Sequence, residues 1–245
     1  MQLKNLLVVL FASFLLFSIQ ACSEDSNPTE PTQEKPDQIS MKEITIPEQL
    51  QQSQDAHARV YVVCVNLANG FQKYTALLNP PDTAKINKEL NTEGDGTYTW
   101  VVEGVTFTLY YSENSVSRTW KIVLNGSDPY DGSVYIDWVY IEASESLDGA
   151  SGRFVVYEPV TINIETEWSW ITDTIGIYNF EIVVHSNDGF KINITNNPDN
   201  SGTLNWYDNI DGNYVLKMQI TWTSAGTGEW WEYEAGVEVA TGKFP

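Results

Sequence analysis

Apolar and aromatic side chains alternate with polar ones from residue 98 almost to the C-terminus, in short runs separated by turn residues. The runs at residues 98–102 and 105–111 are typical, and Glu103-Gly104 lies between them. A period of two places successive side chains on opposite faces of a strand, whereas a helix needs a period near 3.6. We therefore expect this part of the chain to form strands, each with one apolar face.

This alternation predicts about eleven short strands joined by short turns. They lie within residues 98–102, 105–111, 120–124, 134–141, 154–157, 162–170, 175–184, 190–194, 204–207, 214–222 and 230–233. Turns such as Asp211-Gly212 supply the positive φ angles of tight hairpins, so consecutive strands should pair antiparallel. The expected fold is mainly β, an antiparallel meander that forms a half-barrel or a barrel-like sheet.

A faint internal repeat supports the meander. Gly152, Gly202 and Gly228 are each followed by an apolar residue two positions on, a tyrosine five on and an acidic residue six on. The pattern resembles the glycine-aromatic hairpin repeats of several β-meander families. It indicates hairpins that arose by duplication.

Residues 47–78 follow a different period. Pro47 suits the first position of a helix, and from Leu50 onward apolar or aromatic residues recur in steps of three and four. Residues 60–65 are largely β-branched and favour a strand, but the helical pattern continues for about thirty residues. We therefore expect one long helix over residues 47–78.

Pro80 and Pro81 end this helix, and Asp82 can cap a short helical turn over residues 85–90. The central turns of the long helix are apolar on nearly every side. A helix of that kind must be covered by other parts of the protein. The inner face of the meander is the apolar surface expected to cover it.

The chain begins with Lys4 and an apolar run that ends in Ile19-Gln20-Ala21-Cys22. With about fifteen apolar residues, the run is shorter than the roughly 20 that a membrane-spanning helix needs. A basic start, an apolar core and a small residue are typical of an export signal. The last four residues resemble the bacterial lipoprotein signal, and this resemblance implies that Cys22 is lipidated and becomes the new N-terminus.

Three regions follow from these patterns. We expect a lipoprotein signal peptide over residues 1–21, a disordered acidic tether over 22–46 and a single β-rich domain with its helix over 47–245. The start of the tether, Ser23-Glu24-Asp25, resembles the acidic tag of lipoproteins sent to the outer membrane, although a solvated acidic tether explains it equally well. The expected location is the outer membrane, by a lipid anchor, at the cell surface or on the periplasmic side.

The charge of the chain excludes one class of partner. The sequence has 33 Asp and Glu against 13 Lys and Arg, a net charge of -20. A surface of that sign repels phosphate backbones, so nucleic acid is not an expected partner.

Residues able to carry out catalysis are few. The two histidines, His57 and His185, fit a packed helix face and a turn, and Cys64 has no cysteine partner once Cys22 carries lipid. Oxygen-rich turns near Asp199 and Asp211 lack the spacing of a helix-flanked calcium loop. We expect a protein that is not an enzyme and that has neither a cofactor nor a metal.

Tryptophans are the remaining candidates for a binding site. Trp168 and Trp170 share a strand face, whereas Trp230 and Trp231 must point to opposite faces. All four are candidate ligand-binding residues, although filling the core explains such aromatics as well. The expected architecture resembles the curved half-barrels of lipoprotein carriers, which implies a binding module for an apolar or lipidic ligand. The alternatives are a surface glycan-binding protein that uses exposed aromatics and a structural envelope protein without a ligand.

Overall fold

The computed structural model describes residues 35–87, 95–130 and 132–245. Its helices are α2 (Glu48–Gln52), α3 (Ala56–Gly70), α4 (Gln72–Thr75) and the 3-10 helix η1 (Ala76–Leu78). Its strands are β1 (Lys85–Asn87), β2 (Gly96–Val102), β3 (Val105–Glu113), β4 (Ser117–Ser127), β5 (Val134–Ser146), β6 (Ser151–Tyr157), β7 (Ile164–Thr172), β8 (Tyr178–Val184), β9 (Phe190–Asn196), β10 (Gly202–Ile210), β11 (Asn213–Trp222), β12 (Gly228–Glu234) and β13 (Val237–Phe244).

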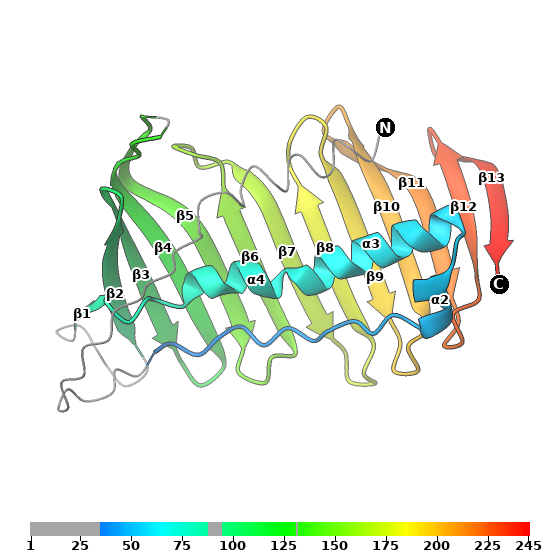
Figure 1. Ribbon diagram of the computed structural model, residues 1–245, viewed down its shortest axis with the longest axis horizontal. Coiled ribbons are helices and arrows are strands. Elements are labelled where there is room, and N and C mark those ends of the chain that lie inside the picture. Colours follow the sequence, from blue (N-terminus) through cyan, green and yellow to red (C-terminus); the bar gives the residue numbers. More distant parts are fainter. Residues whose placement is uncertain (1–34, 88–94, 131) are drawn as a thin grey trace. The chain divides into compact units, whose positions relative to one another are not determined.

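The described strands form one antiparallel sheet in which every strand pairs with its neighbours in sequence, from β1 to β13 (Figure 1). This confirms the predicted antiparallel meander. The sheet is open, because β1 and β13 lie at its two edges and do not pair with each other.

The predicted count of about eleven strands is wrong, since the described residues contain thirteen. The additional strands are β1 and β13. Residues 85–87, expected in a helical turn, pair with β2, where Ile86 lies opposite Tyr98; residues 88–90 of that expected turn lie outside the described residues. The missed β13 contains Ala240 and Gly242 where the other strands carry large apolar side chains, so its alternation is weak.

Two-residue turns join several of the strands, as predicted. Asp211 and Gly212 have φ angles of 51° and 83°, and Glu103 and Gly104 have φ angles of 51° and 91°. Two successive positive φ angles are the geometry of the hairpin turn whose twist matches that of paired strands. These turns make consecutive strands neighbours and so produce the meander.

The single long helix predicted over residues 47–78 is wrong. Ser53 has an extended backbone, with φ -63° and ψ 140°, which ends α2. Asp55 then starts α3, because its carboxylate accepts hydrogen bonds from the backbone N–H groups of His57 and Ala58 at 2.8 and 3.1 Å. A side chain that caps a helix start competes with continuation of the preceding helix, so the chain forms separate helices.

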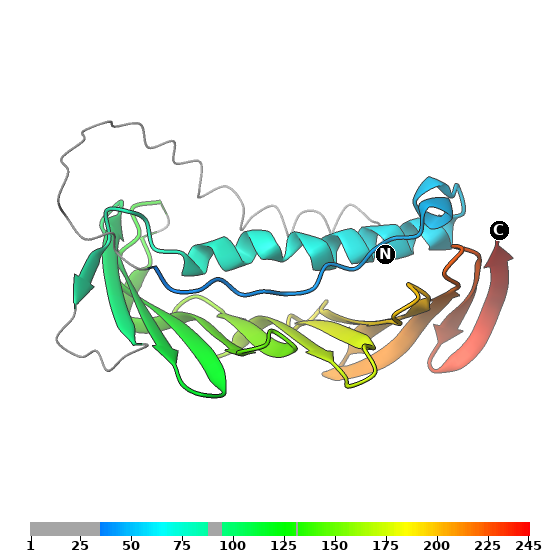
Figure 2. The same ribbon diagram turned by 90° about the horizontal axis from the view of Figure 1, so that it is seen from below.

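Helix α3 lies across one face of the sheet, which we call the inner face (Figures 1 and 2). Its buried residues recur at helical spacing and are Ala58, Tyr61, Cys64, Val65 and Ala68. The ring of Tyr61 lies 4.2 Å from that of Trp222, and Phe71, just after α3, contacts Phe154 at 5.0 Å. The core of residues 35–245 therefore lies between α3 and the inner face.

An extended segment, residues 35–46, lies beside α3 on the same side of the sheet (Figure 2). The sequence placed these residues in a disordered tether, whereas in the structure Ile39, Met41 and Ile44 are buried. Ile44 and Asn69 exchange two hydrogen bonds of 2.9 Å, one in each direction. This segment, which we call the strap, helps to cover the inner face, and residues 22–34 of the expected tether lie outside the described residues.

The repeat at Gly152, Gly202 and Gly228 has a packing role. Each glycine lies on the inner face beneath an aromatic ring from a neighbouring strand, those of Trp170, Trp222 and Phe244 respectively. A Cβ atom at any of these positions would overlap the ring. Glycine under a cross-strand aromatic ring lets the ring lie flat on the sheet, so the repeat reflects how the aromatics pack.

Candidate functional site

Trp168 and Trp170, two of the candidate binding residues, lie on the inner face in β7. The centre of the Phe71 ring lies 5.1 Å from that of Trp168 and 6.1 Å from that of Trp170. The two tryptophans are 6% and 3% exposed. The chain's own Phe71 covers their rings, so both belong to the core rather than to a surface that a ligand can reach.

Trp230 also lies on the inner face and joins β12 to the start of α3. Its ring stacks on that of His57, with 3.6 Å between centroids and 9° between planes. His57 Nε2 lies 3.0 Å from Glu232 Oε1, and His57 Nδ1 lies 3.8 Å from Asp55 Oδ1. These contacts hold the imidazole between two acids and a ring, which gives His57 and Trp230 a structural role.

Trp231 points to the opposite side of the sheet, the outer face, where its neighbours are Gln219 of β11 and Thr241 of β13. Each of the other eight tryptophans contacts another aromatic or histidine ring. Within the described part of the chain, Trp231 is the exception. Trp231 is half-buried, and the exposed part of an indole can stack on another molecule.

Trp231 belongs to a continuous row of residues that crosses the outer face. The strand register places the following residues directly opposite one another, one per strand from β3 to β13: Ser112, Thr119, Ser144, Arg153, Ser169, Glu181, Asn193, Asn205, Gln219, Trp231 and Thr241. We call this set the polar row. At about 4.8 Å between strands, ten steps extend over roughly 48 Å. Trp231 contributes an aromatic ring with one N–H donor, and every other member carries a hydroxyl, an amide or a charged group.

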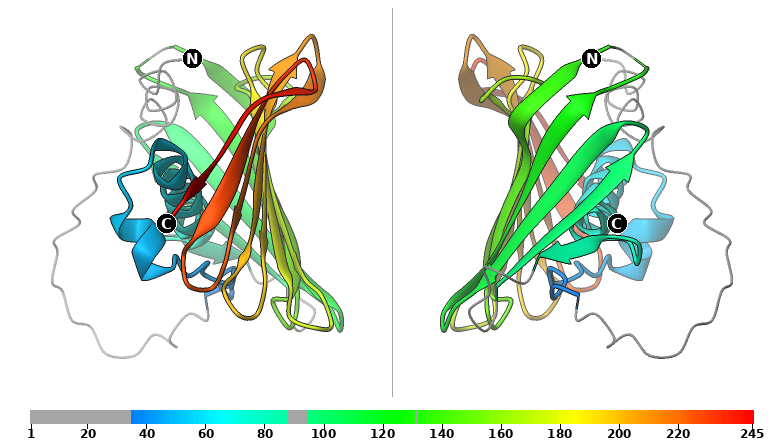
Figure 3. Two further views of the ribbon diagram at one scale, coloured as in Figure 1. Left: turned by 90° about the vertical axis from the view of Figure 1, so that its right-hand side faces the viewer. Right: turned by 90° about the vertical axis from the view of Figure 1, so that its left-hand side faces the viewer.

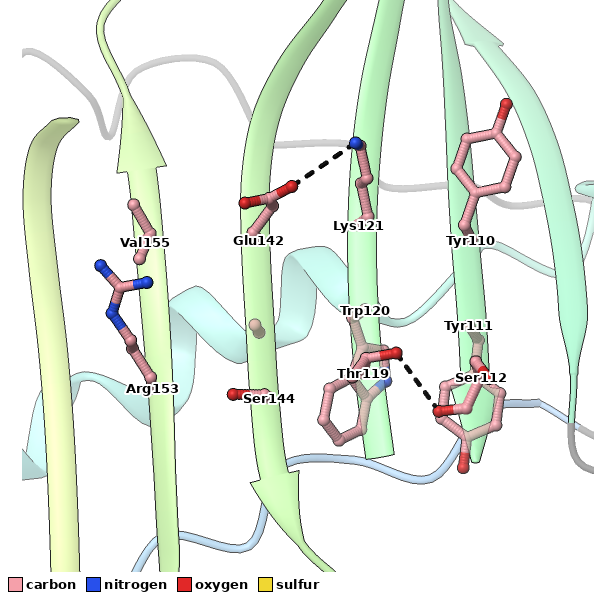
Figure 4. A pocket seen from close by; sticks show the side chains of 11 residues that line it. Tyr110, Tyr111, Ser112, Thr119, Trp120, Lys121, Glu142, Ser144, Arg153 and Val155 are labelled. Atoms are coloured by element: carbon pink, nitrogen blue, oxygen red, sulfur yellow. Dashed lines mark hydrogen bonds and ion pairs between the residues drawn. The ribbon is translucent and has the colours of Figure 1, made fainter. Parts of the chain in front are cut away.

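Two hollows lie along the polar row and meet at Ser144. The first, of about 440 Å³, is lined on the outer face by Thr119, Lys121, Glu142 and Arg153 among others (Figure 4). The second, of about 480 Å³, continues through Ser169 to Thr195 on β9. In Figure 4 the helix lies behind the strands, so the first hollow opens away from the core. Figure 3 shows that the helices lie on one side of the sheet only. The polar surface is therefore shallow, continuous and open.

Several charges on this surface form ion pairs. Lys121 pairs with Glu142 at 3.5 Å, and Lys191 pairs with Glu181 at 3.9 Å. Arg153 Nε and one terminal nitrogen donate to the two oxygens of Glu167 at 2.7 and 2.9 Å. The hydrogen bond with Glu167 raises the pKa of Arg153, so this guanidinium stays charged.

A further pair, Lys243 and Glu229, lies beyond Trp231 at the edge of the sheet. The charges of these four ion pairs cancel (4 - 4 = 0), and Lys217, exposed on β11 two positions before Gln219, belongs to none of them. The whole chain has a net charge of -20. The central outer face is therefore close to neutral within a strongly acidic protein.

Amide side chains of the polar surface are held in place by hydrogen bonds to neighbouring side chains. Asn193 donates to Glu181 at 2.8 Å, and Gln219 donates to Asn205 at 2.8 Å. Side chains fixed in this way lose little conformational entropy when a ligand binds.

A further, largely apolar hollow of about 830 Å³ lies between the first half of β5 and the β6–β7 turn, and it shares Glu142 with the first hollow. Val134, Ile136, Val160 and Ile162 surround it with exposed fractions of 56%, 79%, 57% and 92%. Val160 has a φ angle of 60°, which is rare for a β-branched residue because of steric strain. Exposed aliphatic side chains held by a strained turn mark a possible contact site.

The other residues singled out by the sequence do not gather into a catalytic or metal centre. Burial raises the pKa of the Cys64 thiol to about 12, so this cysteine is protonated and unreactive. His185 is exposed at the end of β8. Within the described residues, no group of three or more His, Cys, Asp or Glu side chains is placed to hold a metal ion.

Cys22, the candidate lipidation site, lies outside the described residues. None of the helices in the described ranges is long and apolar enough to cross a membrane.

Comparison with protein-family models finds no match to the chain, and neither does comparison with curated protein sequences. The candidate site therefore stands on its geometry. The sequence indicated that one of Trp230 and Trp231 faces away from the core without indicating which, and it missed the polar row. The signal was present as short polar residues at alternate positions, and only the strand register aligns them across the sheet.

Proposed function

We propose that this protein is a non-enzymatic, lipid-anchored lipoprotein of the outer membrane whose outer sheet face binds a glycan. The observation that carries the proposal is the continuous hydrogen-bonding surface formed by the two hollows that share Ser144. Sugars present many hydroxyl groups, each able to donate and to accept, and the hydroxyl and amide groups of this surface match that chemistry.

An ordinary solvated sheet face is the competing explanation, because antiparallel sheets often expose one polar face. Solubility alone is commonly met by long charged side chains on exposed strands. Here the polar row consists mostly of Ser, Thr, Asn and Gln, and it also includes the unstacked Trp231. Short side chains and an available indole are more useful for recognition than for solubility.

Glycan binding can be tested by isothermal titration calorimetry of residues 35–245 with soluble neutral polysaccharides. Ser144 lies where the hollows meet, so Ser144→Lys should fill both and lower the affinity by at least about tenfold, or 1.4 kcal/mol. Ser127→Lys is the matched control, because Ser127 is exposed at the end of β4 and outside both hollows. Failure of the unaltered protein to bind any such polysaccharide would remove this proposal.

The lipid anchor is supported by the residues from Ile19 to Cys22. Replacing Cys22 by Ser should move the protein from the membrane fraction to the soluble fraction. Retention of the variant in a pellet that only detergent dissolves would contradict the anchor.

Binding of an apolar or lipidic ligand is the second candidate function. A ligand between the sheet and α3 would have to displace buried rings such as Phe71, so the apolar hollow is the better location. Ile162→Asp should then abolish binding of a fluorescent fatty acid, whereas Ile175→Asp should not, because Ile175 is 72% exposed but outside the hollow. Equal binding by both variants would exclude this hollow.

A further inference from the structure

The polar row is longer than a site for one sugar unit, because it crosses the strands from one side of the sheet to the other. From Ser144 on β5 to Trp231 on β12 there are seven strand spacings, or roughly 34 Å. A single sugar covers a small part of that distance. The length of the row therefore matches a polymer of many sugar units that runs across the strands.

The charge of the outer face indicates which class of polysaccharide it can bind. The ion pairs of the outer face neutralise one another, so the row itself offers no unpaired cation to an anionic sugar. Beyond the row, the net charge of -20 repels polyanions over about a Debye length. A polycation would be attracted by the whole surface rather than by the row. An uncharged chain is the one that this surface can select.

The twist of the sheet indicates whether the ligand is a single chain or a flat crystalline surface. Neighbouring strands rotate by about 20–25° relative to one another, so the row winds as it crosses the sheet. A flat crystalline polymer face would contact only a few strands. A single soluble chain can follow the row from the hollows to Trp231.

Trp231 has a particular place in this arrangement. It lies three strands beyond β9, where the second hollow ends, and it is the aromatic member of the row. A ring at that position can stack on a sugar unit far from those held in the hollows.

We propose that the outer face binds one soluble, linear, uncharged polysaccharide chain across the strands, with its central units in the two hollows and a distal unit on Trp231. This inference rests on the proposed glycan-binding function and adds the charge, the length and the direction of the ligand.

The experiment compares affinities for neutral linear oligosaccharides of increasing length, from a disaccharide upward, by isothermal titration calorimetry. Affinity should rise with length until the chain reaches from the hollows to Trp231 and then level off. Trp231→Ala should weaken binding of the longest chains by about tenfold and leave the shortest unchanged. Trp231→Phe should recover most of the loss because it retains a ring.

Two controls separate binding from folding and from charge. Trp100→Ala removes a half-buried indole from the inner face, and it should leave affinity at every length unchanged. A soluble polyuronate should not bind. A polycationic glycan should bind only at low salt and should not respond to Ser144→Lys.

The outcomes distinguish the two proposals. If no neutral oligosaccharide or polysaccharide binds, glycan binding itself is wrong. If neutral glycans bind and Ser144→Lys blocks them, but affinity does not depend on length or Trp231→Ala has no effect on long chains, glycan binding stands and the cross-strand chain is wrong. Preferential binding of the polyuronate, or of an insoluble crystalline polymer, would likewise overturn the inference.

Discussion

Several polar atoms in the core lack a hydrogen-bond partner among the described residues. They include the hydroxyls of Tyr61 and Tyr178 and the side-chain oxygen of Asn196. Tyr178 lies directly opposite Asn196 in the β8–β9 pair, and burial raises the pKa of its phenol. An unsatisfied buried polar group costs about 1–3 kcal/mol, so these atoms lower the stability of an otherwise closely packed core.

Tyr178→Phe tests this cost at one residue. Removing the unpaired hydroxyl should raise the free energy of unfolding by about 1 kcal/mol, because the ring is kept and only the buried polar atom is lost. Tyr157→Phe is the control, since its hydroxyl donates to Glu142 at 2.7 Å and its loss should destabilise by about 1 kcal/mol. Urea denaturation measures both. Destabilisation by Tyr178→Phe would mean that a bound water or ligand satisfies that hydroxyl.

Glu145 is a buried carboxyl group on β5 that fixes the strap. Its Oε1 accepts hydrogen bonds from the backbone N–H of Ser40 at 2.8 Å and from the Ser40 hydroxyl at 3.3 Å. Burial raises the pKa of Glu145, and nearby Asp148 adds to this, while Ser40 and Arg118 oppose it. The strap is thus held by a carboxyl group that is costly to ionise.

We therefore expect Glu145→Gln to stabilise the protein by an amount that depends on pH. The pKa of Glu145 is raised in the folded state, so the folded protein keeps this proton to a higher pH than the unfolded chain does. As the pH rises above the ordinary value of 4.5, the unfolded chain loses the proton first, and the free energy of unfolding falls. Glutamine keeps an acceptor for Ser40 and carries no charge. The variant should be the more stable near pH 8, and its advantage should vanish near or below pH 4. An equal difference at both pH values would refute this account.

At the scale of elements, α3 has one face that is necessary for the core and one that is not. Phe71, at the end of α3, is fully buried against Phe154 and Trp168, whereas Val63 is 43% exposed. Phe71→Ala should cost about 3–5 kcal/mol by opening a cavity, and Val63→Ala should cost less than about 1 kcal/mol. Thermal or urea denaturation gives both values. Similar losses would show that the exposed side of α3 is covered too.

The sequence was sufficient to predict the antiparallel meander, because alternation and turn residues are local signals. It could not predict β13, whose Gly242 lies beneath Trp230, since that small residue is explained only by a partner strand. It also missed the break in the predicted helix, because the helical spacing continues past Asp55, whereas the backbone is extended at Ser53 and the Asp55 carboxylate caps the start of a new helix.

The candidate site was predictable only in part, for the same reason. Alternation shows that Trp230 and Trp231 face opposite sides, but not which side is covered. Register places Trp231 in line with Ser144, and register depends on every turn and bulge between them, including the irregularities after Val156 and Trp206. A row across strands is thus a property of the assembled sheet.

At the scale of the whole molecule, residues 35–245 form one compact unit in which a single layer of chain covers the sheet. The strap and α3 lie on the inner face, and none of the helices in residues 35–87 lies on the polar outer face (Figure 3). Inner-face side chains such as Trp120, Phe180 and Ile220 are at most 1% exposed. An open sheet needs this cover because its apolar face would otherwise be in water.

A chain that begins at Asp82 should therefore fail to fold as a monomer. It lacks the strap and the helices but keeps the whole sheet, so the inner face would lose the cover that Phe71 and Tyr61 provide. Burying one such large side chain contributes about 1.5–3 kcal/mol, and the loss of several exceeds the 5–15 kcal/mol that stabilises a typical domain. Size-exclusion chromatography should show aggregates, whereas a chain that begins at Lys35 should elute as a folded monomer and melt cooperatively. If the chain from Asp82 is instead soluble, monomeric and cooperative, then α3 is an appendage. Its apolar face would in that case be free to bind a partner. The contacts between α3 and the sheet would then not be needed for folding.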